Sequence, residues 1–325
     1  MPLPKDVNGC PYLQLAPMEG VGDPAFRKAI AAVGGFDEAV VAFLRVPRNA
    51  HVKSLAMRYN AHEIAPVPLA AQIMGSDPDL MAAMAQELVQ RGALRIDVNC
   101  GCPSQIVTSR GAGSVLLKDP ELLFKVVSAV VRAVSIPVTI KMRSGYEDTA
   151  LFFENLSAAE ASGVQYITLH PRTKADGYHS PARWDLIAKA KQFLKLPIVG
   201  NGDICTVEDA LRMLRETGCD GLMMGRGSVM NPFLFHQIRA HFSKTVFQPK
   251  VEDLVRYFQV YISVLPNDLT PKQQVNKVKQ LLSLFCKSSE SLLQKRHEIL
   301  AAEHTDPHAF FAFVQLFLKE LWYSK

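Results

Sequence analysis

Two cysteines and an asparagine stand where an apolar run of strand length gives way to a loop. Residues 93–98 are followed by Asn99-Cys100-Gly101-Cys102-Pro103-Ser104 and then by the glycine-rich turn at 110–113. Loops held on a rigid scaffold are frequent sites of catalytic residues. We therefore take Cys102 as a candidate catalytic residue, and Cys100 as a small hydrophobic residue of the core.

Cys102 could act as a nucleophile, a metal ligand or an acid. A nucleophile usually needs a partner base, and none lies nearby in the sequence. The six cysteines, at positions 10, 100, 102, 205, 219 and 286, include no C-x-x-C pair, so we expect neither a metal site nor a disulfide framework. A thiol with the reference pKa of about 8.5 is largely protonated at pH 7 and can donate a proton.

Apolar runs rich in β-branched residues alternate with longer amphipathic segments. Strands are predicted at 13–16, 39–43, 68–73, 94–99, 138–142, 166–170, 198–200 and 221–224. Helices are predicted at 24–33, 79–91, 120–134, 152–162, 184–193 and 207–217. Eight strands alternating with helices predict a parallel α/β fold, the closed TIM (β/α)8 barrel. An open doubly wound sheet is the alternative, but no G-x-G-x-x-G follows the first strand.

Active sites of such barrels lie at the carboxyl ends of the strands. Seven of the eight predicted strands end in polar or special residues, and only the second, which passes through Ala42, does not. This convergence indicates a binding or catalytic site. The residues include Pro17, Met18, Gln72, Asn99, Lys141, Arg143, His170, Arg172, Asn201, Gly202, Asp203, Gly225 and Arg226.

The last two strand ends indicate a phosphorylated cofactor. Gly225-Arg226 offers backbone N–H groups and a guanidinium, and a helix is predicted to begin near Asn231, which together suit a phosphate. The triplet Asn201-Gly202-Asp203 offers an amide, an unobstructed backbone and a carboxylate suited to polyol hydroxyls. Ordinary glycine turns would explain either segment alone.

Three further side chains suit a flavin ring. An unpaired ammonium is costly to bury in a strand, so Lys141 could stabilise negative charge on a reduced flavin. The Gln72 amide could bond the ring edge as donor and acceptor. A lone histidine is more often structural, and only its position at a strand end makes His170 a candidate flavin ligand.

The chain of 325 residues is 48% hydrophobic and 21% charged, which is typical of a globular protein with an ample core. No run reaches the roughly 18 apolar residues of a membrane helix, and the start lacks the features of a signal peptide. We expect a cytoplasmic protein with no membrane partner. The net charge of +5 permits a polyanionic partner without requiring one.

After residue 242 the strand pattern stops. A linker is predicted at 243–250, and helical periodicity at 251–264, 271–286, 289–302 and 307–322 predicts a small all-α domain. Domains are therefore expected at 1–242 and 251–325. Six basic residues between 272 and 296, among them Lys277, Lys279 and Lys287, stand against the single acid Glu290. This run is either a solvated helix face or a surface that follows phosphates.

In order and spacing, these motifs resemble the bacterial tRNA-dihydrouridine synthase family over nearly all of the chain. The resemblance is carried by Leu15-Ala16-Pro17-Met18-Glu19-Gly20-Val21, Gln72, Asp97-Val98-Asn99-Cys100-Gly101-Cys102-Pro103-Ser104, Gly111-Ala112-Gly113, Ile140-Lys141-Met142-Arg143, His170-Pro171-Arg172-Thr173-Lys174, Gly177-Tyr178, Asn201-Gly202-Asp203 and Gly225-Arg226.

The resemblance implies a barrel that binds FMN and a helical domain that helps to hold tRNA. NADPH or NADH would reduce the flavin, hydride would pass to the double bond of a D-loop uridine, and Cys102 would supply the proton. It implies flavin contacts for Ala16, Pro17, Met18, Gln72 and Lys141, and ribityl or phosphate contacts for Asn201, Gly202, Asp203, Gly225 and Arg226. Asn99 and Arg143 would face the substrate nucleotide or tRNA, and Arg172 and Lys174 would lie near the barrel mouth.

Two positions depart from the family pattern. Gln105 stands where many members carry lysine, and Ala42 where some subfamilies carry an acid, so the subfamily, the tRNA orientation and the reduced uridine stay open. An FMN barrel that acts on a small molecule, as a dihydroorotate dehydrogenase does, is one alternative, and a non-catalytic RNA-binding barrel is another. The Arg172/Lys174 pair and the basic helical segment argue against the first, and Lys141 with Cys102 argues against the second. We expect a monomer, although no particular residue or motif indicates the oligomeric state.

Overall fold

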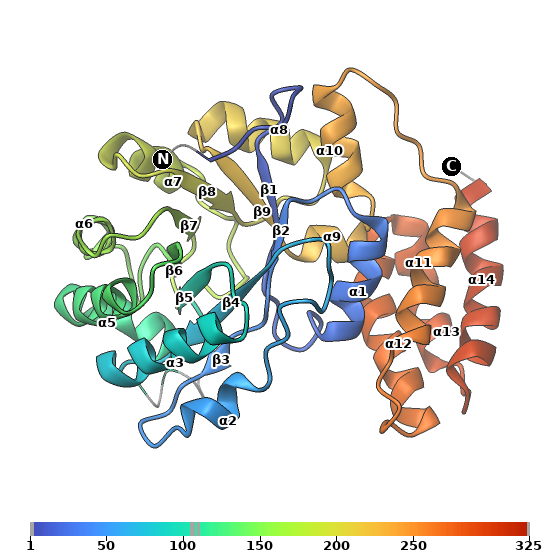
Figure 1. The fold of residues 1–325 in the computed structure, drawn as a ribbon. Helices are drawn as coiled ribbons and strands as arrows, with labels where there is room; N and C mark the ends of the chain where they lie inside the picture. Colours follow the sequence, from blue (N-terminus) through green and yellow to red (C-terminus); the bar gives the residue numbers. More distant parts are fainter. Residues whose placement is uncertain (1–2, 105–107, 109–110, 324–325) are drawn as a thin grey trace. The chain divides into compact units, whose positions relative to one another are not determined.

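The computed structural model describes residues 3–104, 108 and 111–323, and these form a closed barrel of eight parallel strands followed by helices (Figure 1). The ring runs β1-β2-β4-β5-β6-β7-β8-β9 and closes where β9 pairs with β1. The predicted TIM barrel is confirmed. Its strands are β1 (Tyr12–Leu15), β2 (Glu38–Val40), β4 (Leu69–Met74), β5 (Ile96–Cys100), β6 (Val138–Arg143), β7 (Ile167–His170), β8 (Ile198–Asn201) and β9 (Gly221–Met224).

The second strand differs from the predicted one. The chain forms β2 and then, after a break, the two-residue strand β3 (Leu44–Arg45). β3 pairs with the carboxyl end of β4, where Arg45 stands opposite Met74. The Val41 N–H still donates to the Ala70 carbonyl (3.0 Å), so the chain leaves the β4 ladder only after that bond. An apolar run of this length does not reveal such a break, because every residue in it suits a buried strand.

Three of the helices between strands begin at an aspartate followed by proline. Asp23, Asp77 and Asp119 each accept a hydrogen bond from a backbone N–H of the first turn, and the proline that follows has no N–H to satisfy. These local signals explain why the predicted helix starts lie within a residue of the observed ones. The segments are α1 (Pro24–Val33), α2 (Val52–Ala56), α3 (Pro78–Gln90), η1 (Gly113–Lys118), α5 (Pro120–Ala133), α6 (Phe152–Ala161), α7 (Asp185–Phe193) and α8 (Val207–Thr217).

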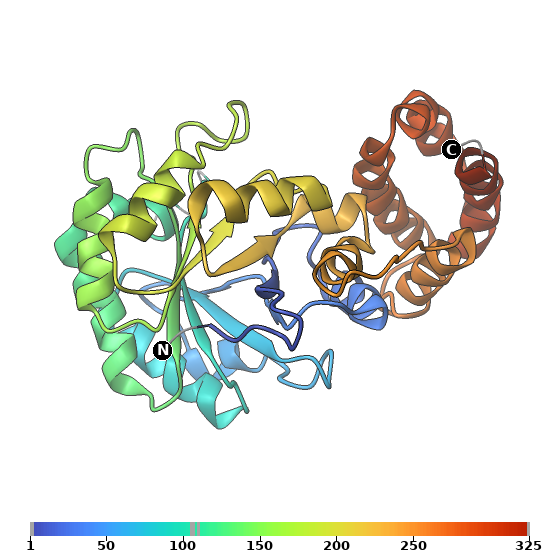
Figure 2. The same ribbon diagram turned by 90° about the horizontal axis from the view of Figure 1, so that it is seen from above.

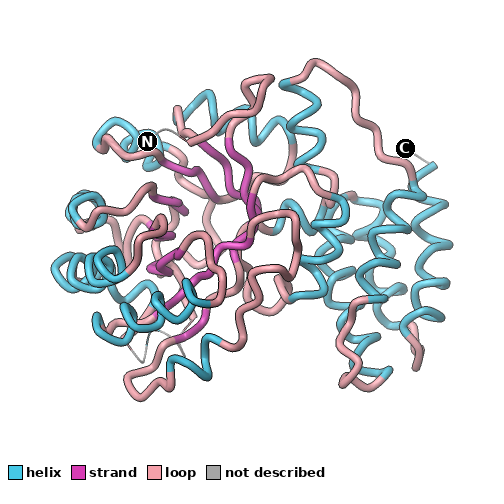
Figure 3. The backbone as a smooth tube through the Cα atoms, in the orientation of Figure 1, coloured by secondary structure: helices cyan, strands magenta, loops and turns pink. Residues whose placement is uncertain are grey.

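After β9 the described chain is helix and loop only (Figure 3). The helix predicted near Asn231 begins at Leu234, and a short helix that was not predicted begins at Arg226. None of the helices in the described ranges has both the length and the apolar character to cross a membrane. The segments are α9 (Arg226–Met230), α10 (Leu234–Phe242), α11 (Val251–Ser263), α12 (Pro271–Phe285), η2 (Cys286–Ser288), α13 (Glu290–Ala301) and α14 (Pro307–Tyr323).

The chain groups into two compact units. The barrel unit comprises residues 1–17, 36–204 and 208–224, and the helical unit comprises 18–35, 205–207 and 225–325. In the helical unit α11, α12, α13 and α14 pack side by side (Figure 2, orange to red), and α1 packs against α11. The Phe258 ring lies 5.4 Å from that of Phe285 and 5.3 Å from that of Phe311, at the centre of this core. The predicted domains, 1–242 and 251–325, are stretches expected to fold independently. Compact grouping does not test independent folding, so these bounds stay a prediction.

Candidate active site

Strand register brings the predicted side chains of the barrel unit to one end of the sheet. In β5 and β6, Asn99 stands opposite Lys141, and in β6 and β7, Arg143 stands opposite His170. Gln72 lies in β4, opposite Asp97 of β5. Since all these strands are parallel, their carboxyl ends share one face of the barrel.

Lys141 lies half-buried and donates from Nζ to Oδ1 of Asn201, 3.1 Å away. Asn201 is fixed in turn, because its Nδ2 donates to the Met223 carbonyl at 2.8 Å. Burial of the ammonium, with a smaller effect of the nearby Arg143, lowers the Lys141 pKa to about 8. A poorly solvated ammonium of this kind attracts an electron-rich ligand.

A chain of amide hydrogen bonds connects Asp97 to the turn that carries Cys102. Nε2 of Gln72 donates to Oδ2 of Asp97 (2.7 Å), and Oε1 of Gln72 accepts from Nδ2 of Asn99 (2.9 Å). Oδ1 of Asn99 accepts the backbone N–H groups of Gly101 (3.0 Å) and Cys102 (2.9 Å). Each amide therefore has one orientation, and Asn99 shapes the turn on which the thiol sits.

The two cysteines of this turn lie in different surroundings. Cys100 is fully buried, and burial raises the pKa of its thiol far above the ordinary value, so it is an inert core residue, as predicted. Cys102 is 7% exposed and packs against Met74, Ala112 and the half-buried Phe43. Within the described ranges, no three histidine, cysteine or acidic side chains are placed to hold a metal ion.

Arg143 is buried and bonded to the loops beside it. Its Nε donates to the Gly101 carbonyl (3.0 Å), and one terminal nitrogen donates to the Thr173 carbonyl (2.8 Å) and the Gly177 carbonyl (3.3 Å). Its guanidinium carbon lies 5.4 Å from the centre of the Tyr178 ring. This geometry favours a role for Arg143 in positioning the Cys102 turn, in addition to its predicted contact with the substrate.

Arg172 and Asp203 form a bidentate ion pair. The two guanidinium nitrogens donate to the two carboxylate oxygens at 3.0 and 2.6 Å, and the Ala182 N–H donates to the same carboxylate at 2.9 Å. Arg172 is only 3% exposed. The pairing favours a structural role for this guanidinium over the predicted contact with tRNA. Lys174 is half-buried, and its ammonium lies 5.0 Å from the centre of the Tyr146 ring.

Gly202 has a backbone conformation and close neighbours that disfavour a side chain. Its φ is 110°, and a Cβ would stand 3.2 Å from Ala182 and 3.4 Å from Nε2 of His170. The carbonyl of Gly202 accepts from the Trp184 indole at 3.0 Å. The buried His170 ring accepts the Arg172 N–H at Nδ1, at the long distance of 3.4 Å. The Gly202 backbone is buried among these groups, so its contact with a ribityl chain stays a prediction.

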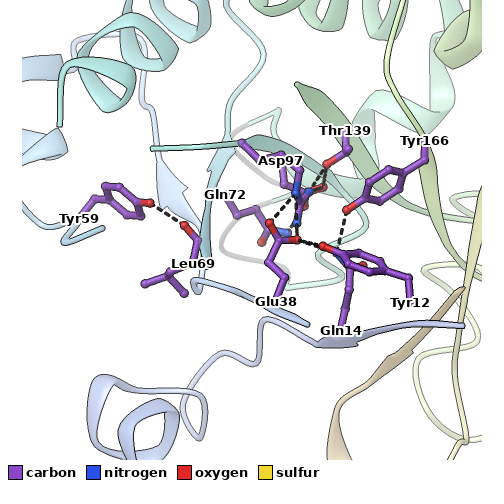
Figure 4. Close-up of polar contacts among 10 residues, drawn as sticks. Tyr12, Gln14, Glu38, Tyr59, Leu69, Gln72, Asp97, Thr139 and Tyr166 are labelled. Atoms are coloured by element: carbon purple, nitrogen blue, oxygen red, sulfur yellow. Dashed lines mark hydrogen bonds and ion pairs between the residues drawn. The ribbon is translucent and has the colours of Figure 1, made fainter. Parts of the chain in front are cut away.

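Toward the amino ends of the strands lies a buried ion network that the sequence motifs did not indicate (Figure 4). Arg95 donates from Nε to both oxygens of Glu38 (3.0 Å each), and a terminal nitrogen reaches Oδ1 of Asp97 at 3.4 Å. Burial opposes the charge on Arg95, but the Glu38 carboxylate holds its pKa well above the ordinary value. The network comprises Tyr12, Gln14, Glu38, Arg95, Asp97, Thr139 and Tyr166.

This network is connected to the amide chain through Asp97, whose carboxylate accepts from Thr139 (2.6 Å) as well as from Gln72. Asp97 is the residue of this arrangement to which the motif assigned no role. The available signal was charge in or beside apolar strand runs: Glu38 stands at the start of one, and Arg95 and Asp97 interrupt another. Charges in such positions are rare unless they are paired.

Residues around the first and last strands divide between the units. Ala16 is buried in the barrel unit, where its N–H donates to the Met224 carbonyl at 2.8 Å, and Pro17 is half-buried. Met18, half-buried in the helical unit, accepts the Gly22 N–H at 2.8 Å in a tight turn. Their flavin contacts stay a prediction. The same holds for Gly225 and the exposed Arg226, which lead into the short α9.

The predicted basic face of the helical unit is partly committed to internal contacts. Nζ of Lys277 lies 3.0 Å from Oδ2 of Asp23, and Nζ of Lys279 donates to the Ala302 carbonyl at 2.7 Å. Lys287 is exposed. Of the two departures from the family pattern, Ala42 lies half-buried after β2, and Gln105 lies outside the described residues.

Comparison with known proteins relates this chain to one family by both a family model and individual relatives. A family model described as dihydrouridine synthase (Dus) matches residues 14–314. A tRNA-dihydrouridine(16) synthase of Pseudomonas syringae pv. tomato is 39% identical over 288 residues, which cover 85% of this chain and 90% of that one. A tRNA-dihydrouridine(16) synthase of Neisseria meningitidis serogroup B is 39% identical over 236 residues, 70% of this chain and 71% of that one.

Among solved structures, histamine dehydrogenase from Rhizobium sp. 4-9 is similar with a TM-score of 0.52 over 77% of this chain and 48% of that one. At 12% sequence identity the likeness concerns the fold alone, and it agrees with the TIM barrel. The family match, by contrast, spans nearly the whole chain at substantial identity. On that ground the chain belongs to the dihydrouridine synthase family.

Proposed function

We propose that this protein reduces uridine 16 in the D-loop of tRNA to 5,6-dihydrouridine, with FMN as cofactor and NADPH as electron donor. The family match supports the reaction class, and relatives named tRNA-dihydrouridine(16) synthase support the tRNA position. The proposal rests on one observation: Lys141 and the hydrogen-bonded turn that carries Cys102 lie at the same end of a TIM barrel.

The residues at this end of the barrel fit FMN. Lys141 uses one N–H on Asn201 and retains others for the oxygens and negative charge of a flavin ring. The Gln72 amide is fully buried and bonded to Asp97 and Asn99, so its flavin contact is assigned by motif match. By motif match we assign the ribityl chain to Asn201, Gly202 and Asp203, and the phosphate to Gly225 and Arg226.

The protein's own groups then have defined roles. When bound and reduced by NADPH, FMN supplies hydride to the uracil double bond. Cys102 Sγ donates its proton to the neighbouring ring carbon, so that the base gains two hydrogen atoms and the thiolate recovers a proton from solvent. Asn99 and Arg143 hold the turn that aims the thiol. A uridine within folded RNA must leave its stack to reach such a site.

The test is direct. Purified protein, FMN and NADPH are incubated with an unmodified tRNA transcript, and the RNA is digested and mapped by mass spectrometry. We expect the mass of two added hydrogen atoms at uridine 16 and at no other D-loop uridine, with NADH as the comparison donor. Reduction at another position would overturn the site assignment, and no reduction at all, with flavin bound and reduced, would overturn the function.

A further inference from the structure

A basic pocket lies on the barrel unit where the chain leaves β3. The pocket, about 470 Å³ in volume, is lined by five polar or cationic side chains from the segment that runs from β3 to just beyond α2. We define the basic pocket by these residues, which are Arg45, Asn49, His51, Ser54 and Arg58.

The segment that forms this pocket carries a single sign of charge. Residues 39–62 contain Arg45, Arg48, Lys53 and Arg58 and neither aspartate nor glutamate. Arg45 is half-buried, and the other three are exposed. Among the described residues, no acidic side chain forms an ion pair with any of the four. The two guanidinium groups, with an amide and a hydroxyl beside them, are hydrogen-bond donors that have no carboxylate partner among the described residues.

The pocket adjoins the candidate active site. Arg45 stands opposite Met74 in the β3–β4 ladder. Met74 packs against Cys102, and Phe43, two residues before Arg45, packs on the same group. An anion held by Arg45 would therefore lie close to a nucleotide placed at Cys102.

We propose that the basic pocket binds backbone phosphates of the RNA substrate near the nucleotide being reduced, about one phosphate at each of its two arginines. Arginine forks match phosphate oxygens in pairs, and contacts to phosphates fix the register of a nucleic acid without reading its sequence. This inference rests on the proposed function and adds to it a contact on the barrel unit itself. The predicted lysines of α12, in contrast, already bond to Asp23 and to the Ala302 carbonyl.

The test compares two double variants of the full-length protein loaded with FMN. One carries Arg45→Ala and Arg58→Ala. The matched control carries Arg91→Ala and Arg132→Ala, which remove the same charge from exposed positions at the carboxyl-terminal ends of α3 and α5. Binding of labelled tRNA is followed by fluorescence anisotropy over a range of salt concentrations, and dihydrouridine formation is measured on the same samples.

We expect the pocket variant to bind tRNA about tenfold or more weakly. The slope of log K against log salt should fall by about two, because each of the two arginines neutralises about one phosphate. The control should keep the wild-type slope. Lysine at both positions should restore most of it. If the double variant loses its flavin, the single variant Arg58→Ala should still lower the slope by about one.

Failure of the two proposals can be told apart. A wild-type protein that neither binds nor reduces tRNA overturns the proposed function and this inference with it. A wild-type protein that does both, while the pocket variant keeps the full salt slope, overturns the pocket alone.

Discussion

Cys102 and Cys100 sit two residues apart yet face different surroundings, which makes them a natural pair of variants. Replacing Cys102 with alanine should leave FMN bound and reducible by NADPH, while uridine reduction falls by a factor of about 10²–10⁴, the usual contribution of a positioned acid. Flavin absorbance during a single turnover separates the two half-reactions.

Cys100→Ala is the matched control for that experiment. Its thiol is buried with a strongly raised pKa, so it should affect stability modestly and the rate of uridine reduction little. Equal losses in the two variants would mean that the turn, and not the Cys102 proton, matters.

Lys141 predicts a pH dependence for cofactor binding. Its pKa is lowered to about 8, so the ammonium is charged below that pH and loses its charge above it. Affinity for FMN should therefore be constant from pH 7 toward 8 and then fall as pH rises, by up to about tenfold per pH unit. Fluorescence quenching of free FMN measures the affinity directly.

Two substitutions sharpen this test. Lys141→Arg keeps a charge throughout the range and should flatten the profile, whereas Lys141→Met should bind weakly at every pH. A wild-type profile that is flat between pH 7 and 9 would contradict the lysine's role in holding the ring.

At the scale of elements, the buried ion network joins strands that are distant in sequence. Arg95 precedes β5, Glu38 opens β2, and Thr139 lies in β6. Removing one partner of a buried ion pair strands the other charge and typically costs about 3–5 kcal/mol. Arg95→Met should lower the free energy of unfolding by about that amount, as measured in urea.

The paired replacement is the control for the network. With Glu38→Leu added to Arg95→Met, no charge at position 38 is left unpaired, and the loss of stability should be smaller than for Arg95→Met alone. A double variant that is less stable by the sum of the two single losses would show that the contacts act independently.

Some of these elements could be predicted from local signals and others could not. Asp23, Asp77 and Asp119, each followed by proline, mark helix starts without reference to the rest of the chain. The break between β2 and β3 could not be predicted, because it depends on which strand lies alongside. Motif spacing brought Lys141 and Asn99 to one end of the barrel correctly, but it did not indicate that Arg172 is paired with Asp203.

At the scale of the molecule, contact with tRNA is expected to draw on both units. Lys287 is exposed, whereas Lys277 is paired with Asp23 inside the helical unit. Lys287→Ala should lower the salt slope of tRNA binding by about one, while Lys277→Met should leave the slope unchanged and cost at most about 1 kcal/mol of stability. Anisotropy titrations and thermal melts check the two effects, and a wild-type slope in both variants would make the basic run at 272–296 a solvated face.

Helix α1 groups with the helices that follow β9, although it stands near the start of the chain. Its amphipathic pattern predicts a helix with one buried face, but no local signal says which segment covers that face. In the structure it packs against α11, more than two hundred residues further along the chain. Sequence periodicity predicts elements, and their partners depend on the rest of the molecule.

The Glu38–Arg95 contact has an evolutionary consequence. These residues are 57 positions apart, and a chain that lost only Arg95 would leave the Glu38 carboxylate without a cation inside the barrel. Lineages that replace Arg95 should therefore replace Glu38 as well. Across aligned members of the family, positions 38 and 95 should covary, and a chain that lacks arginine at the second should lack an acid at the first.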